Sequence, residues 1–162
     1  MRGPTLNSSM IVRSYRPEEV ANLARLFTET VRAIDPREYS SEQLAAWAPD
    51  PPDIDYWRAR LTGLNVLVAE QDSAIAGFVT FDSNGHLDHL YVHMQFQRKG
   101  IALALCLRLE QEARSRGVRR MYTDASITAR PFFERAGYHV IAPQTVNFGA
   151  ILLTNYRMEK CL

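Results

Sequence analysis

The order of segments in the middle of the chain constrains the fold more than any other feature of the sequence. Residues 65–70 and 75–81 are typical of strands joined by a short polar turn, and an Asn-Gly turn leads into a third strand at 86–93. An amphipathic helix over 100–116 and a strand at 118–125 follow. Because a strand, a long helix and a strand form a right-handed crossover with parallel strands, we predict a mixed, mostly antiparallel α/β sheet.

The rest of the chain adds elements on both sides of this central unit. A strand at 10–15 and a helix at 20–34 precede it. A short helix at 128–136 and strands at 138–141 and 150–159 follow it. The sequence contains no internal repeat, and 162 residues suit one compact domain.

Two segments differ in composition from their surroundings. Residues 1–9 are polar and patternless, so we predict a disordered leader there and a single domain over 10–162. Residues 37–61 combine a Pro-rich turn with four aromatic side chains and several acids. We predict two short helices in this second segment, which would form a cap over one side of the domain.

The charge balance and the cysteines narrow the class of protein. Nineteen Lys and Arg against eighteen Asp and Glu give a net charge of +1, so no overall field would hold the chain on nucleic acid or a membrane surface. No apolar run reaches the roughly 18 residues that a membrane helix needs. Cys106 falls on the apolar face of a predicted helix, far from Cys161, so we expect no disulfide and a cytoplasmic location.

The strand at 86–93 changes phase within itself. Its apolar residues stand at Leu87, then at Leu90 and Val92, and an undisturbed strand cannot keep all three on one face. One extra residue near Asp88 or His89 would restore the alternation, and such a β-bulge is common beside active sites. The alternative is a strand that is apolar on both faces. A bulge would bend this strand away from its parallel neighbour and leave backbone groups near Leu90 and Val92 without partners.

The loop that follows this strand carries an unusual charge pattern. Arg98 and Lys99 stand directly before the long helix, where the helix dipole disfavours cations unless an anion is bound. Gly100 leaves the backbone amides at the helix start open. These features fit a pyrophosphate cradle, and the alternative is a solvated helix start. A dinucleotide fold would require more glycines here, and a P-loop would require the order Gly-Lys rather than Lys-Gly.

Two segments resemble a known family. The run from Leu90 to Ala102, with Gln97-Arg98-Lys99-Gly100-Ile101-Ala102, resembles the signature Q/R-x-x-G-x-G/A of the GNAT superfamily of acyl-CoA N-acyltransferases. The run from Asp124 to Tyr138 resembles the second cofactor segment of that family. Trp47-Ala48-Pro49 and the end of the chain, 153–160, resemble its bacterial YafP-like branch. The resemblance covers nearly all of 10–162 and implies a GNAT-like twisted sheet with a bulged, splayed central strand pair and flanking helices.

The resemblance also implies the cosubstrate and its site. Acetyl-CoA would donate an acetyl group directly to an amine, without a metal. Backbone groups of the bulged strand would bind the pantetheine arm. The amides of the loop would bind the pyrophosphate, and basic side chains would bind the nucleotide end. The residues expected at the cosubstrate are Leu90, Tyr91, Val92, Gln97, Arg98, Lys99, Gly100, Ile101, Ala102, Ser126, Ala129, Phe133 and Arg135.

Some positions depart from the family pattern. Met94 stands where a proline is usual, and Ser126 stands where an asparagine is common. Phe133 occupies the position of a tyrosine that protonates the leaving thiolate in many members, and it has no proton to give. Coenzyme A would then leave as a thiolate, or would be protonated by water or by another residue such as Tyr138.

Two residues are candidates for the base that removes the ammonium proton. His86 and Asp88 flank Leu87 on one face of the bulged strand, and His86 matches the glutamate that serves as the base in histone-type members. The alternatives are that His86 only starts a strand and that Asp88 pairs with a cation. The amide near Val92 would polarise the thioester carbonyl. Cys106 is expected to be a packing residue.

The predicted cap is the candidate for acceptor recognition. Its acids and aromatic faces suit a cation, and Tyr39 and Trp47 are the proposed contacts. The alternative is that the aromatic side chains only pack the cap onto the sheet. A small-molecule amine is favoured over a protein lysine, and a homodimer is compatible with the resemblance. A non-catalytic acyl-CoA sensor is the competing function, although a pure binder would not require His86 and Asp88.

Overall fold

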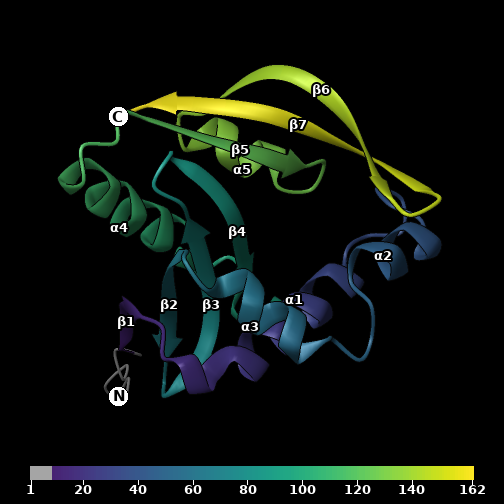
Figure 1. Cartoon of the computed structure of the whole chain (residues 1–162), viewed down its shortest axis with the longest axis horizontal. Helices are drawn as coiled ribbons and strands as arrows, with labels where there is room; N and C mark the ends of the chain where they lie inside the picture. Colours follow the sequence, from purple (N-terminus) through teal and green to yellow (C-terminus); the bar gives the residue numbers. More distant parts are fainter. Residues whose placement is uncertain (1–8) are drawn as a thin grey trace, which may run out of the picture.

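The computed structural model describes residues 9–162, and Figure 1 shows their arrangement. Most of the predicted leader, residues 1–8, lies outside the described residues. The strands are β1 (Met10–Ser14), β2 (Asn65–Gln71), β3 (Ala74–Phe81), β4 (His86–Val92), β5 (Arg120–Ser126), β6 (His139–Phe148) and β7 (Ile151–Cys161). The helices are α1 (Val20–Arg32), α2 (Ser41–Trp47), α3 (Ile54–Leu61), α4 (Ile101–Ser115) and α5 (Arg130–Arg135), with short 3₁₀ turns η1 (Pro17–Glu19) and η2 (Met94–Phe96).

The seven strands form one mixed sheet, in the order β1-β2-β3-β4-β5-β7-β6. The pairs β1–β2, β2–β3, β3–β4, β5–β7 and β6–β7 are antiparallel, and β4 and β5 are parallel. The predicted mixed sheet is therefore confirmed. The parallel pairing is short, because β4 and β5 pair only at His86 with Tyr122 and at Leu87 with Thr123.

The predicted bulge is also confirmed. Phe81 of β3 pairs with Leu87 of β4, but the preceding Thr80 pairs with His89, so Asp88 is the extra residue. Leu87 packs in the core beneath α4, while His89 lies on the opposite face of the sheet, against aromatic side chains of α1 and α3. The bulge thus resolves the phase change seen in the sequence.

Helices cover both faces of the sheet. One face carries α4 and α5, with Leu105, Leu109 and Phe133 in its core. The other face carries α1 and the two helices of the predicted cap, α2 and α3, with Leu23 and Trp57 in its core. Figure 1 shows α4 and α5 apart from α1, α2 and α3.

The cap helices begin at residues whose side chains accept backbone hydrogen bonds. Ser40 accepts from the amide of Gln43, whose side chain accepts in turn from the Ser40 amide, a capping box. Asp53 accepts from the amide of Tyr56 at 3.0 Å. The sequence prediction of two short helices within 37–61 is therefore confirmed.

The strand predicted at 138–141 is longer in the structure. β6 continues to Phe148, past a bulge at Ile141 and through Pro143. The predicted strand ended at Ile141, two residues before Pro143, and a proline cannot donate to a strand ladder. β6 is, however, the last strand of the sheet, and an edge strand tolerates a proline whose missing N–H would point to solvent.

Three further features of residues 9–162 concern membrane helices, cysteines and metal-binding groups. None of their helices is long and apolar enough to cross a membrane. Cys106 is buried and Cys161 is exposed, and both are free thiols. Among these described residues no group of His, Cys, Asp and Glu is arranged to hold a metal ion.

Candidate active site

The splayed edge of β4 presents backbone groups toward β5. The amide of His93 donates to Ala76 of β3 at 2.8 Å, and backbone directions alternate along a strand. The N–H and C=O groups of Leu90 and Val92 therefore point away from β3, to the side where pairing with β5 has ended. The Val92 carbonyl accepts a hydrogen bond from the side chain of Gln97 at 3.0 Å.

The loop after β4 turns its backbone sharply into α4. Gly100 immediately precedes the helix with φ of +77°, a conformation that favours glycine, and Arg98 also has a positive φ of 62°. A Cβ atom placed on Gly100 would meet nothing within 4 Å. Open space therefore lies beside the amides that begin this 15-residue helix, next to the exposed Arg98 and Lys99.

The segment after β5 faces the same region. Ser126 ends β5, and its hydroxyl accepts from the amide of Ala129 at 3.0 Å. Phe133 on α5 is buried and packs edge-on against Tyr138, with ring centroids 5.1 Å apart. Arg135 ends α5 and is exposed. Ser126 thus lies at the end of β5, close to the splayed part of β4, whereas the Arg135 side chain is exposed to solvent.

A cavity of about 500 Å³ lies between the sheet and the cap, within the size range of small-molecule sites. Its lining reaches from the cap across β4 and β5 to the β6–β7 hairpin. The aromatic residues in its wall are Phe27, Tyr39, Trp47, Tyr56, Trp57, Tyr91 and Phe148. The polar residues in its wall include Asp53, Arg60, His86, Asp88, Asp124 and Ser126.

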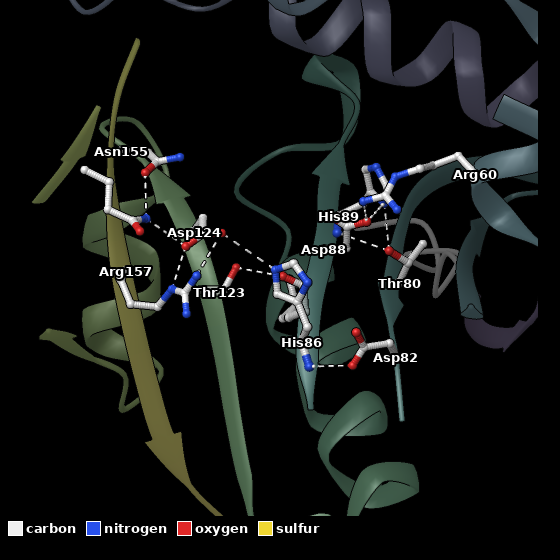
Figure 2. Close-up of polar contacts among 12 residues, drawn as sticks. Arg60, Thr80, Asp82, His86, Asp88, His89, Thr123, Asp124, Asn155 and Arg157 are labelled. Carbon is white, nitrogen blue, oxygen red and sulfur yellow. Dashed lines mark hydrogen bonds and ion pairs between the residues drawn. The ribbon is translucent and has the colours of Figure 1, made fainter. Parts of the chain in front are cut away.

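His86 is held in this wall on three sides. Its ring stacks on Tyr122, with centroids 4.8 Å apart and planes only 9° from parallel. Its backbone amide donates to the Asp82 carboxylate at 3.0 Å. Its Nε2 lies 3.8 Å from the Oδ2 atom of Asp124, and Figure 2 shows the two side chains turned toward one another between β4 and β5.

Asp124 is a functional candidate that the sequence interpretation missed. Partial burial alone would raise its pKa, but hydrogen bonds from Arg157 and Gln144 and the charge of Arg157 outweigh this and hold the pKa below its usual range. The Arg157 Nε lies 2.7 Å and the Gln144 Nε2 2.8 Å from Oδ1. Asp124 therefore stays ionised beside His86 at neutral pH. Its place diagonally across the parallel pair from His86 depends on strand register, which composition does not reveal.

The other candidate base has a cationic partner. Asp88, the bulged residue, forms an ion pair with Arg60 of α3, so the alternative considered for Asp88 is present in the structure. Figure 2 shows Arg60 reaching across to Asp88. The guanidinium of Arg60 donates to the Asp88 carboxylate and so occupies an oxygen that a base would need for the amine proton. Of the two sequence candidates, His86 is the one whose imidazole lies beside a carboxylate, that of Asp124.

His89 differs from His86 in its surroundings. It is 9% exposed, and its Nδ1 lies 2.7 Å from the Thr80 hydroxyl. Burial lowers the pKa of His89 to about 4, although the neighbouring Asp88 carboxylate opposes the shift. His89 is therefore neutral at pH 7, with its Nδ1 at hydrogen-bond distance from the Thr80 hydroxyl.

The two predicted acceptor contacts both line the cavity. Tyr39 and Trp47 lie edge to face, with ring centroids 5.5 Å apart. The Tyr39 hydroxyl donates to the carbonyl of Thr154 and accepts from the amide of Ile127, each at 2.8 Å. This hydroxyl joins the cap side of the cavity to β7 and to the end of β5, and its ring remains in the wall.

The comparison with protein families decides the assignment. Residues 36–160 match the family described as Acetyltransferase (GNAT) domain. This chain belongs to the GNAT acetyltransferases. The Escherichia coli (strain K12) protein named "Uncharacterized N-acetyltransferase YafP" is 31% identical to this GNAT chain over 148 residues, which cover 91% of this chain and 93% of that protein.

Solved structures agree with this GNAT assignment. A GCN5-related N-acetyltransferase from Rhodopseudomonas palustris superimposes with a TM-score of 0.91 at 32% identity, covering 99% of this chain and all of that one. The PaiA N-acetyltransferase from Thermoplasma acidophilum, solved in complex with coenzyme A, shares the fold with a TM-score of 0.75 at 19% identity, covering 95% and 99% of the two chains.

Proposed function

We propose that this GNAT acetyltransferase transfers the acetyl group of acetyl-CoA to a small amine with an apolar body, with His86 as the base. The single observation that carries the proposal is the cavity of about 500 Å³, whose wall includes both His86 and residues of the splayed strands, Tyr91 and Ser126. An amine bound there would lie between a proton acceptor and the edge that suits the pantetheine arm.

The backbone groups of Leu90 and the N–H of Val92, on the side of β4 where pairing with β5 has ended, suit the pantetheine arm, which would extend along β4 like an added strand. The amides of residues 97–102, opened by Gly100, suit the pyrophosphate, and Arg98, Lys99 and Arg135 suit the anionic nucleotide end. Ser126, Ala129 and Phe133 would line the thioester end.

The chemistry follows from these positions. His86 takes one proton from the ammonium group, directly or through a water, and the freed nitrogen attacks the thioester carbonyl carbon. The new C–N bond forms while the N–H of Val92 stabilises the negative oxygen. As the C–S bond breaks, coenzyme A leaves as a thiolate and the nitrogen loses its second proton to water.

Water is the proposed proton carrier to the thiolate. Phe133 has no acidic proton, and the Tyr138 hydroxyl is buried without a hydrogen-bond partner among the described residues. Burial and the nearby Cys106 and Glu110 raise the pKa of Tyr138. A thiolate is a stable enough leaving group to depart without an acid, because thiols ionise near pH 8.5.

The wall of the cavity supports the acceptor class. Of its acids, Asp88 is paired with Arg60 and Asp124 with Arg157, so Asp53 is the wall carboxylate that has no ion pair among the described residues, and it favours a cationic amine. The aromatic side chains, Trp47 and Tyr39 among them, favour an apolar or ring-bearing body over a long polyamine. The cavity volume of about 500 Å³ suits a small molecule.

Release of free coenzyme A from acetyl-CoA tests this proposal. The purified protein would be screened with phenethylamine and tryptamine, with spermidine, and with a lysine-containing peptide. Release that depends on the aryl-alkyl amines supports the proposal. Release with the peptide alone would refute the acceptor class. Tight binding of acetyl-CoA without turnover on any acceptor would favour a sensor over an enzyme.

A further inference from the structure

We propose that Asp124 is a positioning residue for His86, which holds the imidazole in one tautomer and stabilises the imidazolium that forms when the amine loses its proton. This inference rests on the proposed function. The motif segments single out neither Asp124 nor its partners for this role. The two side chains come from the paired ends of β4 and β5, where His86 lies opposite Tyr122, so Asp124 stands two residues further along the neighbouring strand.

The carboxylate is oriented by groups other than His86. Oδ1 accepts from Arg157 at 2.7 Å and from Gln144 at 2.8 Å, and Gln144 also donates to Asn155 at 3.0 Å. Oδ2, whose contact with Arg157 is longer at 3.5 Å, is the oxygen that faces His86. β6 and β7 thus hold one oxygen and leave the other turned to the imidazole.

The imidazole is restrained in the complementary way. Stacking on Tyr122 fixes the plane of the ring, and Arg157 lies on that same tyrosine, 4.9 Å from its ring centroid. With Nε2 toward the Asp124 carboxylate, the neutral ring carries its hydrogen on Nε2 and keeps a lone pair on Nδ1. Nδ1 is then the atom that accepts the amine proton.

Other charges also surround His86. Asp82 accepts a hydrogen bond from the His86 backbone amide, Asp88 is the bulged residue two positions along the same strand, and Arg60 pairs with Asp88. Asp124 is the carboxylate at ion-pair distance from the ring, 3.8 Å, a gap that shortens to a hydrogen bond once the imidazolium forms. A carboxylate that orients a metal-binding histidine changes affinity or activity by about 10- to 100-fold, and we expect an effect of the same order for His86.

Asp124→Asn tests the inference, because asparagine keeps the shape and still offers an oxygen to Arg157. We expect kcat to fall about 10- to 100-fold with an unchanged KM for acetyl-CoA. The loss of kcat relative to wild type should become smaller between about pH 7 and about pH 9.5. At the higher pH more of the amine is already neutral in solution and no longer needs a base. Glu159→Gln is the matched control on β7, since Glu159 pairs with Arg120 at 3.1 Å, and it should keep wild-type kcat.

The outcomes separate this inference from the proposed function. If His86→Ala loses activity while Asp124→Asn keeps it, or if the Asp124→Asn deficit is the same at every pH, Asp124 has no positioning role. If neither variant loses activity, the proposed base itself is wrong. Nitrogen-15 NMR of His86 in the wild-type protein gives a test without any variant: the Nε2–H tautomer is expected, and the Nδ1–H tautomer would overturn the inference.

Discussion

The buried His89 makes stability depend on pH in a way that can be calculated. Burial lowers its pKa from the ordinary 6.5 to about 4. Above pH 6.5 the residue is neutral in both the folded and the unfolded chain. Between pH 6.5 and pH 4 the unfolded chain takes up a proton that the folded chain refuses, so the free energy of unfolding falls as the pH falls. From this residue alone we expect a loss of about 2 kcal/mol at pH 5 and about 3 kcal/mol at pH 4.

Replacing His89 with leucine should remove this part of the pH dependence. The leucine side chain fits among Phe27, Trp57 and Phe78, and Thr80 keeps its hydrogen bond from the backbone amide of residue 89. Urea unfolding of wild type and His89→Leu at about pH 7.5 and about pH 5 gives four free energies of unfolding, and their double difference cancels the carboxylates common to both proteins.

The control is His139→Gln, which changes an exposed histidine on β6 and should leave the wild-type pH dependence unaltered. Equal losses of stability in wild type and His89→Leu between these two pH values would refute the reasoning. So would an NMR titration of wild type in which the His89 ring takes up its proton near pH 6.5. That titration remains decisive if the leucine variant folds poorly.

Three further predictions concern the walls of the site. Gly77→Ala places a Cβ atom 2.7 Å from the Tyr91 carbonyl, so β4 must shift, and calorimetry should show weaker binding of acetyl-CoA; unchanged affinity would mean that the splayed edge is not the pantetheine site. Gly100→Val forces a β-branched residue to a φ of +77°, which costs about 1 kcal/mol or more. The variant should therefore have both a lower affinity for acetyl-CoA and a lower melting temperature. Unaltered values would show that the loop does not need this turn. Trp47→Ala should raise the acceptor KM about tenfold with the KM for acetyl-CoA unchanged, and an unchanged acceptor KM would remove Trp47 from the acceptor site.

Much of the fold could be predicted because its determinants are local. The misplaced apolar residues Leu87 and Leu90 required an extra residue between them, and the structure has it at Asp88. The Asn-Gly turn likewise predicted the antiparallel pairing of β3 with β4. The amphipathic helix between two strands predicted the parallel pairing of β4 with β5. The end of β6 escaped prediction because whether Pro143 is tolerated depends on the place of the strand in the sheet.

The candidate site was less predictable, because its partners come from distant segments. Arg60 meets Asp88 only after α3 has folded over β4, and Asp124 meets His86 only through the register of the parallel pair. Arg157 and Gln144 reach Asp124 from the antiparallel strands on its other side. The motif gave the strand and the loop of the site, whereas the side chains that hold the base depend on tertiary contacts.

The central claim is that His86 accepts the proton of an amine that receives the acetyl group directly from acetyl-CoA. Formation of the acetylated amine, followed by mass spectrometry at about pH 7 with wild type, His86→Ala and Asp88→Asn, tests it most directly. The account predicts that kcat falls at least about a hundredfold in His86→Ala, the usual contribution of a general base, with the KM for acetyl-CoA unchanged and a smaller loss in Asp88→Asn. Full activity of His86→Ala, or loss confined to Asp88→Asn, would contradict it.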